Sequence, residues 1–155
     1  MKENLKFMFQ SNQNVLKRLL DDVGDKETLD RAGGLCNPIR WQAGHLAWCA
    51  DLVAWLLGGD RAFPEKWTAL FEYGSKSPDD NTVFPPYREI CGKLYELQTK
   101  VNDLLEAFDE SKFADEVELG EDWRMNRLDA LFFFGKHDSY HAGQITILRK
   151  SLGLQ

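Results

Sequence analysis

The sequence contains few of the features that are typical of secreted proteins. It has three cysteines, Cys36, Cys49 and Cys91, which show no CxxC spacing and cannot all pair with one another. This usage favours a reduced compartment, and we expect a cytoplasmic protein. The first residues, MKENLKFMFQSNQN, contain no long apolar run after a basic start, so they do not resemble a secretory signal.

Long apolar runs and an excess of basic residues are also missing. A membrane span requires about 18 consecutive apolar residues, and LAWCADLVAWLLGG is short and interrupted by Asp51. The net charge of −6 provides no basic face for nucleic-acid phosphates. We therefore expect neither a membrane nor a nucleic acid as partner. The length of 155 residues predicts a single domain over residues 1–155.

What the sequence does contain is helical periodicity, in four segments. The first segment covers about residues 3–20. The second begins at NPIRW, where Asn37 is the expected N-cap and Pro38 the first helical residue, and it ends at Gly58-Gly59. The third follows FPPY, and the fourth covers about residues 123–152. No segment alternates as a strand would, so the sequence predicts an all-α fold, a four-helix bundle.

Two connections between the expected helices are informative. The 25 residues DRAFPEKWTALFEYGSKSPDDNTVF separate the second helix from the third, and PEKWTALFEY is predicted to form a short helix of its own. A long crossover of this kind allows consecutive helices to run in the same direction. The acidic stretch FDESKFADEVELGED joins the third helix to the fourth, and we expect a solvated loop there.

The three histidines of the chain all fall on apolar helical faces. His137 and His141 are four residues apart and project together, in line with Ala130, Phe134, Ile145 and Leu148. His45 shares a face of the second helix with Trp41, Trp48, Leu52 and Leu56. The pattern therefore directs every histidine toward the bundle interior.

Two interpretations of these histidines are open from the pattern alone. Each imidazole can be a core residue with one satisfied hydrogen bond. Alternatively, one metal ion satisfies a nitrogen on each ring at once, and unpaired buried nitrogens are costly. Imidazole suits several first-row metals, and histidines on facing helices are a common way to build a metal site in a bundle.

The motifs WQAGHLAW and HDSYHAGQI, together with WTALFEYGS and the later PP, resemble the DinB/YfiT-like superfamily (DinB_2) over essentially the whole chain. The resemblance implies a four-helix bundle in up-down-down-up order, with a long crossover between the second and third helices. It also implies one divalent metal ion, commonly nickel or zinc, bound by His45, His137 and His141. Three imidazoles also admit iron or manganese.

Three protein ligands leave an open coordination position, which is typical of a catalytic site. The expected function is a metal-dependent enzyme that acts on a small-molecule substrate. It would be either a hydrolase or, as the resemblance implies, a transferase that uses a low-molecular-weight thiol. Cys49 lies four residues after His45 and would close the shell as a fourth ligand, although a small apolar core residue is the simpler interpretation.

Four further residues are candidates for the pocket. Gln144 follows His141 by three residues and Tyr140 follows His137 by three, so both are expected near the ligands. Trp41 and Trp48 flank His45, where they either wall the pocket or simply pack in the core. No HExxH or ExxH motif is present, which disfavours a zinc peptidase and a di-iron carboxylate centre.

The alternative function is a non-catalytic bundle, metal-stapled or metal-free, that acts as a dimeric interaction or stress-response module. Phe7, Trp55 and residues 132–134 are predicted to lie on helical faces that the core does not use. Such apolar surface favours a homodimer.

Overall fold

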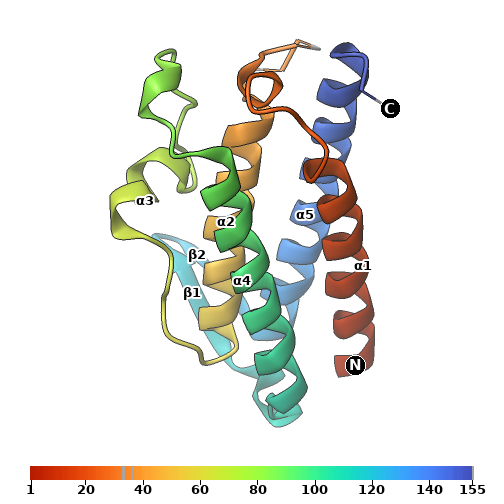
Figure 1. Cartoon of the computed structure of the whole chain (residues 1–155). Helices are drawn as coiled ribbons and strands as arrows, with labels where there is room; N and C mark the ends of the chain where they lie inside the picture. Colours follow the sequence, from red (N-terminus) through yellow and green to blue (C-terminus); the bar gives the residue numbers. More distant parts are fainter. Residues whose placement is uncertain (33, 36, 155) are drawn as a thin grey trace.

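The helices expected from the sequence are present in the computed structural model, which describes residues 1–32, 34–35 and 37–154 (Figure 1). Cys36 lies outside the described residues. The helices are α1 (Lys2–Leu20), α2 (Ile39–Leu56), α3 (Glu65–Phe71), α4 (Tyr87–Ala107) and α5 (Arg127–Ser151). Short 3₁₀ turns cover Glu27–Leu29, Asn81–Val83 and Glu110–Ala114. Among the described residues, no helix is both long and apolar enough to cross a membrane.

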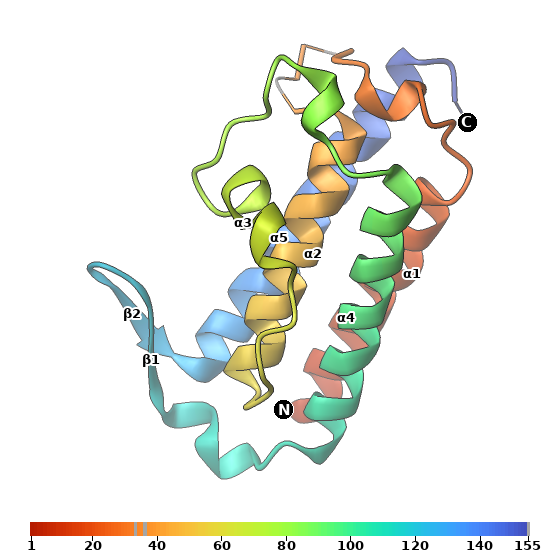
Figure 2. The ribbon, with the colours of Figure 1, turned by 60° about the vertical axis from the view of Figure 1, so that its left-hand side comes forward.

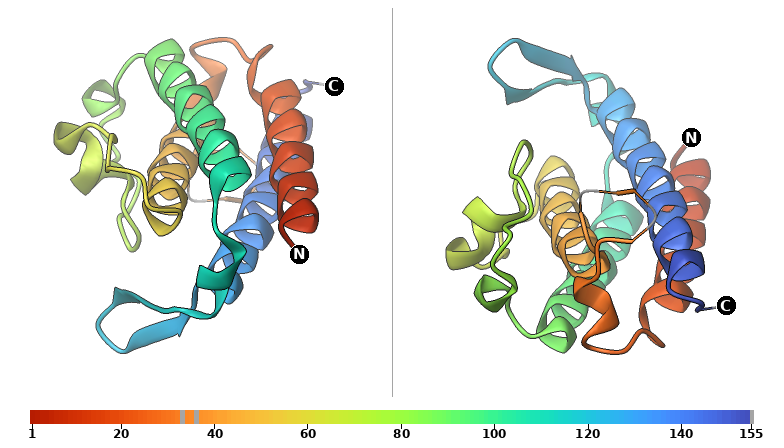
Figure 3. Two further views of the ribbon diagram at one scale, coloured as in Figure 1. Left: turned by 90° about the horizontal axis from the view of Figure 1, so that it is seen from below. Right: turned by 90° about the horizontal axis from the view of Figure 1, so that it is seen from above.

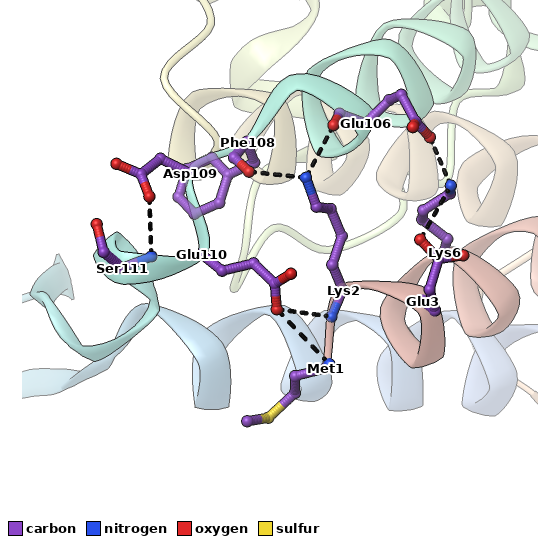
Figure 4. Close-up of polar contacts among 9 residues, drawn as sticks. All are labelled: Met1, Lys2, Glu3, Lys6, Glu106, Phe108, Asp109, Glu110 and Ser111. Carbon is purple, nitrogen blue, oxygen red and sulfur yellow. Dashed lines mark hydrogen bonds and ion pairs between the residues drawn. The ribbon is translucent and has the colours of Figure 1, made fainter.

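The four long helices pack side by side, with α1 against α5 and α2 between α4 and α5 (Figure 1). Hydrogen bonds between their ends show how they run. Lys2 at the start of α1 donates to the carbonyls of Glu106 and Phe108 at the end of α4, at 2.9 Å each (Figure 4). Arg149 near the end of α5 donates to the carbonyl of Leu19 near the end of α1. Thus α1 and α5 run in one direction, and α1 and α4 in opposite directions.

The helix ends follow local chemistry. Pro38 is the N-cap of α2, not Asn37, because the chain at Pro38 is still extended, with ψ of 166°. At the other end, Gly58 has a φ of 87°, a left-handed conformation in which glycine has no steric cost. The amide of Gly59 then donates to the carbonyl of Ala54 at 2.9 Å and closes the helix.

The crossover between α2 and α4 is tied to α2 by a buried carboxylate. Asp51 is fully buried and accepts hydrogen bonds from the backbone amides of Ala62 (2.6 Å) and Phe63 (3.1 Å) and from the Arg61 side chain. This anchor holds the chain as it leaves α2 and places α3 on the outer side of that helix (Figure 2). A buried charge held by several donors avoids the desolvation cost that an isolated one would carry.

A β-hairpin between α4 and α5 corrects the expectations of a wholly helical fold and of a solvated acidic loop. Strands β1 (Glu116–Gly120) and β2 (Trp123–Asn126) pair antiparallel, with Val117 opposite Met125. Val117 is buried, as is Phe113 in the preceding turn. The alternation in VEL and WRM is short and lies within a charged stretch, so the periodicity did not reveal it.

The hairpin also shortens the last helix. Residues 123–126 form β2, so α5 begins at Arg127 and not near Trp123. Asn126 is its N-cap, and its side chain accepts from the amide of Asp129 at 2.8 Å. The hairpin and the α2–α4 crossover extend from the same side of the bundle (Figure 3).

Of the aromatic residues expected on the outer faces, Phe7 is 74% exposed, Trp55 42% and Phe132 38%. Phe134 is 3% exposed and belongs to the core, which corrects its assignment to the surface. The homodimer stays a prediction.

Close packing of α3 on α2 depends on Gly44. A β-carbon at this position would overlap the buried ring of Phe71. We expect Gly44→Ala to lower the free energy of unfolding by about 1–3 kcal/mol, because a rigid aromatic ring in a dense core has little room to move. Urea denaturation measures this.

The matched control is Gly143→Ala on α5, where a β-carbon meets nothing within 4 Å. Helix propensity alone should raise stability there by about 0.5–1 kcal/mol. Equal effects of the two substitutions would contradict the packing explanation.

Candidate metal centre

The three histidines converge through their Nε2 atoms. His45 comes from the middle of α2, and His137 and His141 come from one face of α5. The Nε2 atom of His137 lies 3.4 Å from that of His45 and 3.1 Å from that of His141. One ligand nitrogen from each residue lies within 4.8 Å of the others. The helical faces predicted from the sequence therefore do bring the three rings together.

His45 is oriented by α3. Its Nδ1 atom lies 2.7 Å from the carbonyl oxygen of Phe71 at the end of that helix. A carbonyl can only accept, so Nδ1 carries the proton and Nε2 keeps a free lone pair. Trp41 stacks on the same ring, with centroids 4.8 Å apart, and its indole N–H donates to the carbonyl of Leu70 at 3.0 Å. The crossover thus sets both the tautomer and the plane of His45.

His141 is oriented by Gln42, a residue that the sequence interpretation missed. The Nδ1–H of His141 donates to Oε1 of Gln42, whose amide group donates in turn to Oε1 of Gln144 at 2.6 Å. Gln42 is fully buried. Its position three residues before His45, on the same face of α2, is the signal that would have identified it.

His137 differs from the other two. Its Nδ1 atom is buried and has no hydrogen-bond partner among the residues that the structure describes. Its ring is stacked on Phe133, with centroids 6.2 Å apart. A buried imidazole with an unpaired nitrogen is costly unless its other nitrogen binds something strongly.

The arrangement fits a metal ion. Two rings present unprotonated Nε2 atoms to the same point, where one proton on Nε2 of His137 can satisfy at most one of them and a cation could satisfy both. A zinc–nitrogen distance of about 2.0–2.1 Å with tetrahedral angles separates ligand nitrogens by about 3.3 Å. The Nε2 separations of 3.1 and 3.4 Å agree with this spacing. Hydrogen bonds from Nδ1 to a carbonyl and an amide are those that metal-binding imidazoles usually make.

Burial also lowers the pKa of all three imidazoles. The pKa of His137 falls to about 4. That of His141 falls to about 2, because burial is reinforced by the neighbouring histidines. The pKa of His45 is lowered by burial, and its hydrogen bond to Phe71 partly opposes the shift. All three rings are therefore neutral near pH 7, which is the form that binds a metal.

A cavity of about 420 Å³ opens beside the cluster. His45 and His137 line this cavity, together with Trp48, Cys49 and Leu52 of α2. Its remaining lining comes from α5, the crossover and the hairpin: Tyr73, Leu119, Gly120, Glu121, Trp123, Phe133 and Phe134. A small molecule in this cavity would lie beside two of the three clustered histidines.

The other residues predicted for the pocket occupy different places. Trp48 lines the cavity, whereas Trp41 supports His45 from behind. Gln144 is hydrogen-bonded to Gln42, and it is Gln42 that contacts His141. Tyr140 is 63% exposed and touches only the edge of His141, at 5.5 Å between centroids.

Cys49 lies beside the cluster but outside it. Its Sγ atom is 3.7 Å from Nε2 of His45, yet the group whose ligand atoms lie within 4.8 Å of one another consists of the three histidines. Burial, with a further contribution from Asp138, raises the pKa of the Cys49 thiol well above its usual value. Asp138 itself lines a small void between the helices with Gln13 and Gln98, and burial raises its pKa to about 7.

Fold and site together define a class of protein: a helical bundle in which two helices direct three histidines toward one point beside a cavity. Comparison with known proteins gives the family. The model of the DinB superfamily matches residues 8–145, and the chain belongs to this superfamily. The crystal structure of a conserved protein from Enterococcus faecalis is similar in fold, with a TM-score of 0.74 and 15% identity, over 99% of this chain and 98% of that one. No curated protein matches the chain.

The contact between Gln42 and His141 predicts an effect on metal affinity. Gln42→Leu should weaken zinc binding about 10–100-fold, because the His141 ring loses the acceptor that sets its tautomer. Competition with a chromophoric chelator measures the affinity. Gln42→Glu keeps an acceptor at this position and should retain zinc. Equal zinc affinity in Gln42→Leu and the parent protein would show that Gln42 does not orient the ligand.

The lowered pKa of His141 predicts a pH-dependent stability of the metal-free protein. The unfolded chain protonates this residue near pH 6.5, whereas the folded chain does so only at much lower pH. The free energy of unfolding should therefore fall as the pH drops from about 6.5 to 4, by up to about 1.4 kcal/mol per unit from this residue.

Comparison with His141→Asn isolates this contribution. Asparagine stays uncharged over the whole range, so the fall should be less steep in the variant. Urea titrations of EDTA-treated protein at several pH values give both slopes. Parallel slopes would mean that His141 is not buried as a neutral ring.

Proposed function

We propose that this protein is a metal-dependent enzyme in which His45, His137 and His141 bind one divalent transition-metal ion. The observation that carries the proposal is the convergence of three Nε2 atoms, two of them held unprotonated by hydrogen bonds from Nδ1. Neutral imidazoles favour zinc or nickel, and iron or manganese are the next candidates.

The cavity supports an enzyme over a metal that only staples the helices. A structural site closes its coordination shell with a fourth protein ligand. Here the histidine cluster borders a cavity of about 420 Å³, and the neighbouring thiol of Cys49 is kept protonated by its burial. We infer that the ion keeps an open position on the cavity side.

A divalent ion held there would act as a Lewis acid and lower the pKa of a water or thiol that reaches it. The residues of the chain would orient the ligands and form the substrate cavity. Phe71 and Gln42 hold the His45 and His141 rings so that their Nε2 lone pairs face the point where the three rings converge, and aromatic side chains line the neighbouring cavity. The reaction is either hydrolysis of a small molecule or transfer to a low-molecular-weight thiol.

Metal content tests the site. Tag-free protein grown with nickel, zinc, iron and manganese should contain one transition-metal ion per chain by inductively coupled plasma mass spectrometry. His45→Ala, His137→Ala and His141→Ala should each lose it. A parent protein that binds none of these metals would overturn the proposal.

Cys49→Ala distinguishes an open site from a closed one. The variant should keep its metal, and the cobalt-substituted form should have the same visible spectrum as the cobalt-substituted parent protein. Loss of the metal in this variant would identify Cys49 as a fourth ligand and favour the structural role.

A further inference from the structure

One part of the cavity lining is a row of neighbouring aromatic rings that begins at His137. Trp123 of the hairpin meets Phe133 of α5 edge-on, with centroids 5.1 Å apart, and lies 6.1 Å from Tyr73 of the crossover. Phe133 in turn is stacked on His137 at 6.2 Å. The aromatic surface therefore extends from the outer rim to a proposed ligand of the metal.

The same cavity carries almost no charge. Among the described residues that line it, Glu121 is the one with a carboxyl side chain, and no lysine or arginine is included. Of the arginines nearby, Arg61 pairs with Asp51 and lies with its guanidinium 6.0 Å from the centre of the Trp48 ring, and Arg124 pairs with Glu118. An anion near Glu121 would meet a carboxylate, which repels it, and aromatic rings, which offer it no cationic partner.

We propose that the cavity selects a small aromatic molecule that carries no negative charge. This inference rests on the proposed function, because the metal ion would bind the reacting end of the molecule while the aromatic wall holds its ring. The proposal also limits which thiols could serve as the second substrate. A thiol that carries carboxylates at the end away from its sulfur would place them next to Glu121. We therefore expect a thiol whose remaining groups are neutral or positively charged.

Three matched thiols test the selectivity. Benzyl mercaptan, 4-(mercaptomethyl)benzoic acid and 4-(aminomethyl)benzyl mercaptan share the sulfur and the ring and differ in the group at the far end, which is a hydrogen, a carboxylate or an ammonium group. Isothermal titration calorimetry on the zinc-loaded full chain should show the neutral and cationic thiols binding at least about tenfold more tightly than the carboxylate. Equal affinities for the three, or tighter binding of glutathione than of benzyl mercaptan, would overturn the proposal.

Glu121 provides the variant and Glu116 its control. Both are exposed acidic residues next to or within the hairpin strands, but only Glu121 lines the cavity. Glu121→Lys should tighten binding of the carboxylate thiol about tenfold and leave benzyl mercaptan unchanged. Glu116→Lys makes the same change of charge away from the cavity and should alter neither affinity. Identical effects of the two variants would show that net charge, not the cavity, sets the preference.

A separate measurement distinguishes this proposal from the metal site. Benzamide, benzylamine and benzoate have no thiol, and their binding to the metal-free full chain is followed by its intrinsic tryptophan fluorescence, to which Trp48 and Trp123 of the cavity contribute. Weaker binding of benzoate than of the other two supports the aromatic cavity even if no metal binds. Equal binding of the three would overturn it even if the metal site is correct.

Discussion

Every buried imidazole has two nitrogen atoms to satisfy, and this requirement organises the centre of the protein. The outer nitrogens of His45 and His141 are paired with a carbonyl of α3 and an amide of α2. The Nε2 atoms of these two rings and of His137 face one another, and the thiol of Cys49 lies 3.7 Å from that of His45. The long helices supply the rings, but α3 and Gln42 decide which nitrogen faces inward. The convergence of the three Nε2 atoms therefore depends on the crossover as much as on the four main helices.

The orientation of the His45 ring depends on contacts that the crossover makes far from the histidines. Asp51 lies near the end of α2 and holds the backbone at Ala62 and Phe63, and the chain then enters α3 and delivers the Phe71 carbonyl to His45. Gly44 leaves the space in which the Phe71 ring packs. The position of the His45 ring thus depends on Asp51, Gly44 and Phe71. None of these three residues is itself placed to bind an ion.

The helices and the three histidines could be predicted from the sequence because both follow the helical repeat, and a repeat is a local property. Gln42 was missed because a glutamine on an apolar stripe has many possible partners, and its partner His141 is 99 residues away. The hairpin was missed because its two strands are short and its apolar positions are few, at Val117, Leu119, Trp123 and Met125. These side chains are covered by contacts with α5 and the crossover. Such contacts join residues that are distant in the sequence, so a pattern in a short stretch of sequence cannot reveal them.

The helical bundle provides the three histidines, whereas the hairpin provides part of the cavity wall, and this separation affects how the protein can evolve. The proposed ligands and the residues that orient them lie on helices whose packing tolerates little change. The outer wall of the cavity lies instead on two strands and a turn, where exposed residues such as Glu121 support no core packing. Substitutions or insertions in this hairpin would change the rim of the cavity without touching the three histidines or the residues that orient them. Loops and short strands of this kind tolerate such changes far better than packed helices do, so the cavity can be reshaped independently of the histidine cluster.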